Sequence, residues 1–423
     1  MLNKLKKVDL KSKVLLQNTL MLYILQFSSY LFSFITVPYQ TRILGPELYG
    51  MLGVAGAVML YFQLFLDFGF LLSATEDISK NREDRLYVCK KITSIALIKV
   101  ILGLFSLIIM SVLLFSVKEF SAHKAVYLIY FAAYAVNSFL PDYVYRGIEK
   151  MTAVTLRTVA VKLLFCVMTF VFLRTKEDYI AVPLLLLIGN CLAVIFAYFH
   201  LLKKLGYSFA KITFKEALYD FKRSSVFFYS RIATTVYSAT NTVVLGFIDK
   251  TGITTGYFTS ADKIVTTAKN GFSPISDSLY PYMVKNKDFR PVKKILTLIM
   301  LPVIIGCVLV GIFSEPLCVF AFGKEFAGAA PILRAFLPAV VIILPSYIFG
   351  FPVMGAMGIS KYANYSIFTG TATHIIGIVI LALTGNISGV TLAAMTSISE
   401  IIIFLYRIAM VYKNRHLLKG ESK

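Results

Sequence analysis

Basic side chains within apolar stretches are the residues of this chain that could do the most specific chemistry. A charge at bilayer depth costs roughly 2.5–3.5 kcal/mol, so such a residue usually faces a partner or a cavity. Arginine binds phosphate oxygens in pairs through its planar fork. Because these cations outnumber the carboxylates in the same stretches, they favour an anionic substrate. The cations are Lys99, Arg157, Lys162, Arg231, Lys263, Lys269, Arg334 and Arg407, and the carboxylates are Asp67, Asp262, Asp277 and Glu400.

Arg231 is the leading candidate for binding an anion because it begins a polar stripe along one face of its helix. Thr235, Ser238 and Thr242 follow at intervals of four, three and four residues, which keeps them on one arc of a 3.6-residue helix. We therefore expect Arg231 to be central to substrate binding. The predicted substrate-binding set is Arg231 first, then Lys162, Lys269 and Arg157, and further Lys263 and Arg334.

For several of these cations a structural explanation stands beside the functional one. Arg157, Arg407 and Lys99 lie near span ends or carry long stems, so that snorkelling to a lipid headgroup explains them equally well. Arg334 lies near the outer end of its span, where an interfacial position would suffice. Lys162 falls near mid-span, roughly 15 Å deep at 1.5 Å per residue, and is the harder one to explain in this way.

Two carboxylates are candidates for coupling transport to an ion. Asp262 shares a helix face with Thr266 and Lys269, and it could pair with Lys269 or carry a coupling proton. Asp67 shares a face with Gln63, and a helix-packing hydrogen bond explains that pair as well as ion coupling does. We predict Asp262 and Asp67 as ion-coupling residues for a proton or sodium ion, and we expect no other cofactor.

The elements that carry these residues are long apolar helices. Of 423 residues, 58% are hydrophobic, and the mean hydropathy is +0.76. A hydrocarbon core of roughly 30 Å needs about 20 apolar residues in a helix, and the chain supplies such stretches from end to end. We expect an all-α membrane protein with twelve transmembrane helices in two six-helix lobes around a central cavity. The predicted spans are 15–37, 49–72, 92–115, 125–141, 152–173, 179–201, 225–248, 255–283, 293–314, 331–350, 362–384 and 387–412.

The net charge of +21 is explained by topology, without a nucleic acid. Most Lys and Arg residues fall on alternate loops, such as 80–91 and 284–294, and on the two tails. The positive-inside rule then places both termini in the cytoplasm. The basic start at residues 1–13 precedes an apolar run of more than twenty residues, which predicts a retained first span rather than a removed signal peptide.

Short matches between the two halves of the chain predict related lobes. The predicted lobes are residues 1–202 and 225–423, joined by a cytoplasmic loop at 203–224. The matches keep one order and a spacing of about 205 to 211 residues, as in transporters with parallel repeats, whose binding site lies between the halves. A Gly-Phe-Ser-Pro sequence at 271–274 is expected to bend or interrupt its helix. The matched segments are LGPELYG at 44–50 with TGITTGY at 251–257, KNREDR at 80–85 with KNKDFR at 285–290, and GIEK at 147–150 with GISK at 358–361.

Motifs for catalysis or metal binding are missing from the sequence. The histidines are dispersed and show no metal-ligand spacing, and there is no nucleophile elbow or phosphate-binding loop. A membrane-embedded polymerase or ligase remains an alternative, but it would usually need a larger polar outer loop than the one at 315–330. We therefore expect a transporter rather than an enzyme. The histidines are His123, His200, His374 and His416.

Nearly the whole chain resembles the Wzx-type oligosaccharide repeat-unit flippases of the polysaccharide export branch, which share the fold of multidrug and toxic compound extruders. The resemblance implies a two-lobed transporter in the bacterial inner membrane that moves an undecaprenyl-pyrophosphate-linked glycan between leaflets. It further implies membrane lipids, a polysaccharide polymerase and a chain-length regulator as candidate partners. The most similar segments are NTLMLYILQFSSYLFSFITVPYQTRILGPELYG at 18–50, SATEDISKNRED at 73–84, YRGIEKMTAVTLRTVAVK at 145–162, SRIATTVYSATNTVVLG at 230–246 and GYFTSADKIVTTAK at 256–269.

Two other transporters of this fold are alternatives. A drug or cation antiporter would be expected to have an acidic cavity without the excess of cations. A lipid II flippase should carry two additional spans for its lipid groove.

Overall fold

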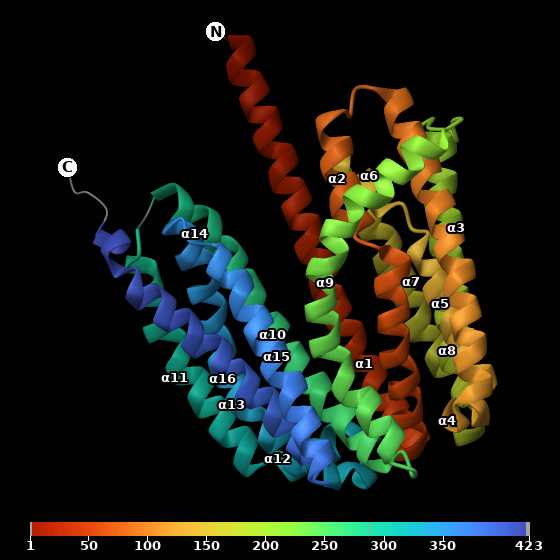
Figure 1. Cartoon of the computed structure of the whole chain (residues 1–423), viewed down its shortest axis with the longest axis vertical. Helices are drawn as coiled ribbons and strands as arrows, with labels where there is room; N and C mark the ends of the chain where they lie inside the picture. The colour runs from red at the N-terminus through yellow and green to blue at the C-terminus, as the bar shows by residue number, and fades with distance from the viewer. Residues whose placement is uncertain (1, 287, 420–423) are drawn as a thin grey trace. The chain divides into compact units, whose positions relative to one another are not determined.

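Helices are the only regular secondary structure in the part of the chain that the structure describes (Figure 1). A computed structural model describes the backbone of residues 2–286 and 288–419, and the side chains of residues 17–417 apart from 230 and 287. An all-helical architecture follows from the apolar sequence, because a helix satisfies its own backbone hydrogen bonds where no water is available. The chain is accordingly all-α, as predicted.

The chain forms two compact units. The first contains the residues up to 44 and residues 55–235, and the second contains residues 45–54 and those from 236 onward. Two helices, α1 and α9, therefore contribute to both units. The predicted lobes at 1–202 and 225–423 concern the related halves of the sequence, and their boundaries stay a prediction.

The first unit is built around α2, α3 and the amino-terminal half of α9, whose apolar side chains form one core. Short 3₁₀ and π turns flank α8 at Lys176–Ile180 and His200–Lys204. Its helices are α1 (Leu2–Asp67), α2 (Phe70–Lys80), α3 (Arg85–Ser116), α4 (Lys118–Ala122), α5 (Lys124–Ser138), α6 (Asp142–Gly147), α7 (Met151–Phe172), α8 (Ala181–Phe199) and α9 (Phe214–Ile248).

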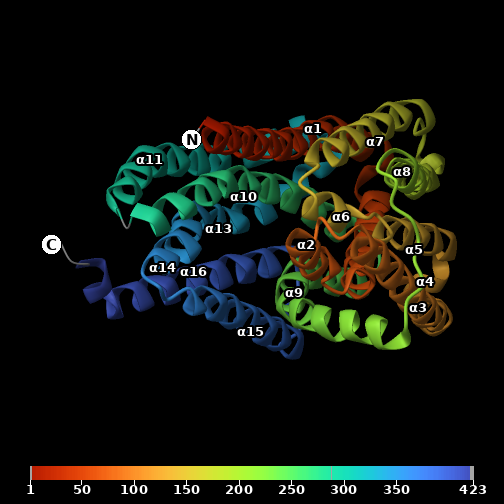
Figure 2. The ribbon, with the colours of Figure 1, turned by 90° about the horizontal axis from the view of Figure 1, so that it is seen from above.

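In the second unit α13 lies between α10 and α16, and α15 runs along α16 (Figure 2). Short 3₁₀ turns at Lys324–Ala329 and Arg415–Lys419 and a π turn at Phe349–Val353 join or end its helices. These helices are α10 (Ile253–Asn286), α11 (Arg290–Ile312), α12 (Ser314–Phe322), α13 (Ala330–Ile348), α14 (Met354–Ala356), α15 (Lys361–Leu383) and α16 (Gly389–Lys413).

Eight helical segments within the described residues are long and apolar enough to cross a membrane. Many of their large apolar side chains stay exposed, such as Leu298 and Leu301 on α11, as expected for a surface covered by lipid. The protein is a multi-pass membrane protein. The eight segments are Gln17–Lys80, Arg85–Ser116, Met151–Phe172, Lys176–Lys204, Arg290–Ile312, Lys324–Ala356, Lys361–Leu383 and Gly389–Lys413.

Each of the twelve predicted spans overlaps a helix, but the number of crossings stays a prediction. The 64-residue segment Gln17–Lys80 carries the first two predicted spans: α1, with a break at Gly45, holds the first and most of the second, and α2 holds the end of the second. The spans predicted on α5, α9 and α10 fall outside the eight apolar segments. The helix is not interrupted at 271–274, since α10 continues through Pro274 and Pro281, and a bend there stays a prediction.

Two turns that match in sequence pack directly against each other within the second unit. Gly45 breaks α1 with a φ of 70°, and Gly252, at the matched position before α10, has a φ of 75°. A Cβ at Gly50 would meet the carbonyl oxygen of Gly252, and a Cβ at Gly256 would meet that of Pro46. Only glycine permits this approach of one backbone to another.

Alanine at Gly256 should destabilise the second unit, because the new Cβ would overlap the backbone of Pro46, which cannot rotate away as a side chain could. Overpacking of this kind costs about 1–3 kcal/mol, so the melting temperature of the purified protein should fall. Gly306→Ala is the matched control, since a Cβ there meets nothing within 4 Å. Equal melting temperatures for the two variants would contradict the close approach.

Asp249 holds the turn that contains Gly252. Its Oδ2 accepts the backbone N–H of Thr255 at 2.8 Å, and its Oδ1 accepts the hydroxyl of Thr251 at 2.7 Å. Burial raises the pKa of the Asp249 carboxyl, but the hydrogen bonds from Thr251 and Thr255 outweigh it, so this pKa lies below its usual value. The ionised carboxylate is therefore the form that stabilises the turn.

Asp249→Asn should lower the melting temperature near neutral pH but not in acid. A carboxyl whose pKa is lowered by folding stabilises the protein above its unfolded pKa of about 3.9, and this contribution is lost as the pH falls through the folded pKa. The difference in melting temperature between wild type and variant should therefore shrink below about pH 4. A difference that stays constant between neutral and acidic pH would speak against this role.

Candidate functional site

A short break between α1 and α2 sets the geometry of the first unit. Phe68 and Gly69 both have positive φ, at 39° and 78°. The ring of Phe68 stacks on Phe221 at 4.3 Å and on Phe228 at 4.6 Å, both from α9. A Cβ at Gly69 would lie 2.8 Å from the carbonyl oxygen of Ser224. The amino-terminal half of α9 is therefore fixed directly over the break.

This contact brings together two residues that the sequence predicts as functional. Asp67 precedes Phe68, and Arg231 lies three residues after Phe228, so the stacked rings place them side by side. Arg231 Nη1 lies 3.7 Å from Asp67 Oδ2. The side chain of Arg231 is 37% exposed and that of Asp67 is 21% exposed. A partly exposed arginine held by one carboxylate can exchange that partner for another anion.

Three further charges extend this pair into a cluster of three cations and two carboxylates. Arg157 Nη2 lies 2.8 Å from Asp142 Oδ1, and Lys99 Nζ donates to the carbonyl oxygen of Ser138. The charges of Lys99 and Asp142 both act on Asp67. We call Asp67, Lys99, Asp142, Arg157 and Arg231 the unit 1 charge cluster. Its excess of cations favours an anionic ligand.

The burial of the side chain tests whether snorkelling to a lipid headgroup can explain a cation. The Arg157 side chain is only 3% exposed, and its Nε has no hydrogen-bond partner among the described residues. Lys99 and Arg407 are also buried, and Arg407 donates to the carbonyl oxygen of Ser346. Snorkelling does not explain these three residues, because their side chains turn inward.

The remaining predicted residue of the first unit is Lys162 on α7. Its Nζ lies 2.5 Å from the hydroxyl of Ser29 on α1, and the side chain is half-buried. This contact ties α7 to the first part of α1, away from the bonds of the charge cluster. A role in substrate binding stays a prediction.

In the second unit, Lys269 pairs with a carboxylate other than the one considered in the sequence. Its Nζ lies 2.9 Å from Glu400 on α16. Asp262 accepts instead from the hydroxyl of Thr266 at 3.3 Å. The neighbouring Lys263 is exposed. The predicted roles of Lys263 in binding and of Asp262 in ion coupling stay predictions.

Arg334 has a structural role at the junction of α11 and α12. Its Nε donates to the hydroxyl of Ser314 at 2.6 Å and to the carbonyl oxygen of Gly311 at 3.1 Å. These bonds satisfy polar groups at a helix end, which explains the residue without a ligand. Its predicted place in the substrate-binding set stays a prediction.

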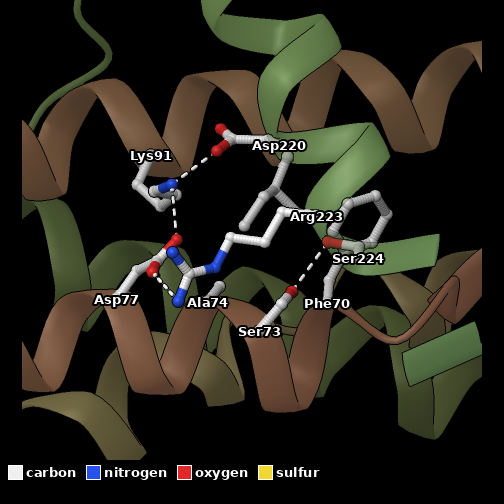
Figure 3. Close-up of a pocket in the computed structure, with 9 residues that line it drawn as sticks. Phe70, Ser73, Ala74, Asp77, Lys91, Asp220, Arg223 and Ser224 are labelled. Carbon is white, nitrogen blue, oxygen red and sulfur yellow. Dashed lines mark hydrogen bonds and ion pairs between the residues drawn. The ribbon is translucent and has the colours of Figure 1, made fainter. Parts of the chain in front are cut away.

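A second ionic network in the first unit had no counterpart in the sequence prediction. Lys91 of α3 lies between two carboxylates, 2.9 Å from Asp77 of α2 and 2.5 Å from Asp220 of α9 (Figure 3). All three side chains are at most 8% exposed. Arg223 reaches Asp77 at 2.7 Å. The network therefore joins α2, α3 and α9 through paired charges.

A weak signal for this network exists in the spacing of its residues. Ser73 and Asp77 lie one turn apart on α2, as do Asp220 and Ser224 on α9, and the two serines share a hydrogen bond of 2.7 Å (Figure 3). These Ser-Asp pairs lack an obvious partner in the sequence, because Lys91 belongs to KNREDRLYVCKK at 80–91, which has the pattern of a solvated basic loop. Lys91 is instead the first inward-facing charge of α3.

Replacing Lys91 by Met should strongly destabilise the first unit. Removing one partner from a buried ion pair costs about 3–5 kcal/mol, because the carboxylates lose their counter-charge. The melting temperature of the purified variant should fall, and adding Asp220→Asn should recover part of the loss.

Lys90→Met provides the control for this experiment. Lys90 precedes Lys91 and pairs with Glu216 at 2.9 Å, but both side chains are well exposed. Its replacement should leave the melting temperature nearly unchanged. Similar losses for the two lysines would show that the buried network contributes no more than a surface pair.

Comparisons with known sequences place these features in context. A family model for polysaccharide biosynthesis proteins matches residues 15–287. A protein of Escherichia coli strain K12 named "Putative O-antigen transporter" is 28% identical over 349 residues, covering 80% of this chain and 83% of that protein. A protein of the same name from Shigella dysenteriae is 27% identical over 337 residues, covering 77% and 83%.

Solved structures show the same fold. The lipid II flippase MurJ in an inward closed conformation matches with a TM-score of 0.74 at 17% identity, covering 93% of this chain and 87% of that one. An inward-facing multidrug resistance MATE family transporter of the MOP superfamily matches with a TM-score of 0.64 at 16% identity, covering 96% and 100%. The predicted MATE-like fold is thereby confirmed.

Proposed function

Because the chain belongs to the family of polysaccharide biosynthesis proteins, we propose that it is a flippase for undecaprenyl-pyrophosphate-linked oligosaccharide repeat units of the O-antigen or capsule type. The protein class is transport rather than catalysis. The names of its two relatives and its likeness to a lipid II flippase support this proposal. The glycan would cross the cytoplasmic membrane by alternating access.

The observation that carries the proposal is the unit 1 charge cluster. A pyrophosphate presents several oxygens that a guanidinium can bind in pairs. Arg231 is the cation of the cluster best placed to do so, since it is the more exposed partner of a 3.7 Å ion pair. Pyrophosphate would replace Asp67 at Arg231, while the prenyl tail stays in the lipid.

The other predicted residues have subordinate roles in this proposal. Arg157 would contribute positive potential near Arg231. The lysines would supply further positive charge along the path of the glycan. Asp67, once displaced from Arg231, would be able to take up a proton or sodium ion, and Asp262 is the second coupling candidate. The proposed further substrate-binding residues are Lys162, Lys263, Lys269 and Arg334.

The proposed setting is the bacterial inner membrane, with both termini in the cytoplasm. The partners are the lipid-linked glycan and the surrounding lipids, together with a polysaccharide polymerase and a chain-length regulator. A polymerase uses the translocated repeat unit as its substrate, so a polymerase close to the flippase would remove the product of transport.

Arg231→Ala should block transport in a flippase-null strain that wild type complements. Hydrogen bonds to a charged group contribute about 1.5–3 kcal/mol, so transport should fall about tenfold or more. Surface polysaccharide should decrease, and lipid-linked oligosaccharide should accumulate on the cytoplasmic side. Arg231→Lys, which keeps the charge but loses the fork, should retain an intermediate activity.

Arg290→Ala serves as the control, because the Arg290 side chain is 92% exposed and its pairing with Asp288 is local. This variant should complement normally. If Arg231→Ala were expressed at the wild-type level and left surface polysaccharide unchanged, the central role of Arg231 would be wrong.

A further inference from the structure

A fully buried histidine lies where three helices of the second unit meet. His374 of α15 is 0% exposed. Its Nε2 lies 3.0 Å from Oδ1 of Asn241 on α9, and its Nδ1 lies 3.2 Å from the hydroxyl of Ser399 on α16. A histidine in an apolar span is costly unless both ring nitrogens are satisfied. Here both are, and the identity of the partners decides what the ring can do.

The hydrogen-bond network assigns the proton on Nε2. The Asn241 amide nitrogen donates to the hydroxyl of Thr396 at 2.9 Å, so the amide oxygen is the atom that faces His374. An amide oxygen only accepts, and therefore Nε2 must carry a hydrogen. The tautomer is fixed by Asn241.

The Nδ1 side of the ring differs, because its partner can reverse its role. The hydroxyl of Ser399 lies 2.8 Å from the carbonyl oxygen of Met395 and 3.2 Å from Nδ1 of His374. With a neutral ring, the hydroxyl donates to Nδ1. With a protonated ring, Nδ1–H donates to the Ser399 oxygen, and the hydroxyl hydrogen turns to Met395.

We propose that His374 is a proton-binding site in the second unit. One proton adds to Nδ1, one hydroxyl rotates, and every polar atom keeps a partner in both states. A histidine with two purely accepting or two purely donating neighbours could not do this, because one protonation state would leave a buried polar atom unpaired.

Charged and titratable groups around the ring link this proton to an anion-binding candidate. Tyr237 of α9 has its ring centre 4.9 Å from that of His374. The charges of Glu400 and Lys269 both reach the imidazole. Since Glu400 pairs with Lys269 at 2.9 Å, an imidazolium at His374 would attract the carboxylate and repel the ammonium, and so weaken this ion pair.

Protonation of His374 therefore loosens Lys269 and makes it available to an anion. This second step rests on the proposed function, in which Lys269 is one of the further residues that bind the anionic substrate. By thermodynamic linkage, binding of the anionic substrate at Lys269 would then favour protonation of His374 as much as protonation favours that binding.

The proton site is tested directly by nuclear magnetic resonance on purified protein with isotope-labelled histidine. The signals of His374 are assigned by their loss in His374→Gln, and those of the exposed His416 by their loss in His416→Gln. The His374 ring should change protonation state reversibly as the pH is lowered from about 7 to about 3. A single protonation state over that range would overturn the proposal. No substrate is needed, so this result is independent of the proposed function.

Ser399→Ala provides a second variant for the case in which His374→Gln does not yield folded protein. It removes the group that accepts from Nδ1–H, so the ring should gain its proton only at lower pH than in the wild type. An unchanged titration would contradict the role of Ser399 and with it the proposed two-state geometry.

The link to Lys269 is tested with farnesyl pyrophosphate as the probe. Its affinity for wild-type protein should rise roughly fivefold or more as the pH falls through the titration of His374, and His374→Gln should lose this dependence. The same pH dependence in both proteins would overturn the link. Absence of binding at every pH would contradict both the proposed function and the link to Lys269. The proton site would still be tested independently by the resonance titration of His374.

Discussion

A charge inside an apolar helix bundle must meet a partner, and the arrangement of the first unit depends on this constraint. Lys91 meets two buried carboxylates, one from α2 and one from α9, and so fixes both helices against α3. Farther along α9, Arg231 meets Asp67 at the end of α1. The two contacts differ in burial. The buried network is suited to hold helices together, whereas the partly exposed pair is suited to exchange partners.

Aromatic stacking decides which charges meet along α9. The backbone of Phe68 has a sparsely populated conformation. The rings of Phe221 and Phe228, which stack on the Phe68 ring, hold the residue in it. Gly69 then allows the α9 backbone to approach without a Cβ between them. Strain of order 1–3 kcal/mol is stored in such a residue, and it is retained where surrounding packing over-determines it. A local break of two residues thereby positions the leading candidate for anion binding.

Much of the fold could be predicted from the sequence, because long apolar stretches in a bilayer permit few structures other than helices. Arg231 and Asp67 could each be identified, since both are charges in apolar spans. Their pairing could not, because it depends on how α9 crosses the break at Phe68 and Gly69. His374 also escaped detection. A search for metal-ligand spacing is blind to a lone histidine, whose meaning comes from Asn241 and Ser399 on other helices.

The contact between the matched turns of the second unit makes two distant stretches of the chain dependent on each other. Gly50 must lack a Cβ because the carbonyl oxygen of Gly252 occupies that space, and Gly256 must lack one because of the carbonyl oxygen of Pro46. A larger residue on either side would be tolerated only with a compensating displacement of the other turn. Among relatives, Gly50 and Gly256 should therefore both stay glycine, although about two hundred residues separate them in the sequence. A backbone contact of this kind restricts how far the sequence of either turn can diverge.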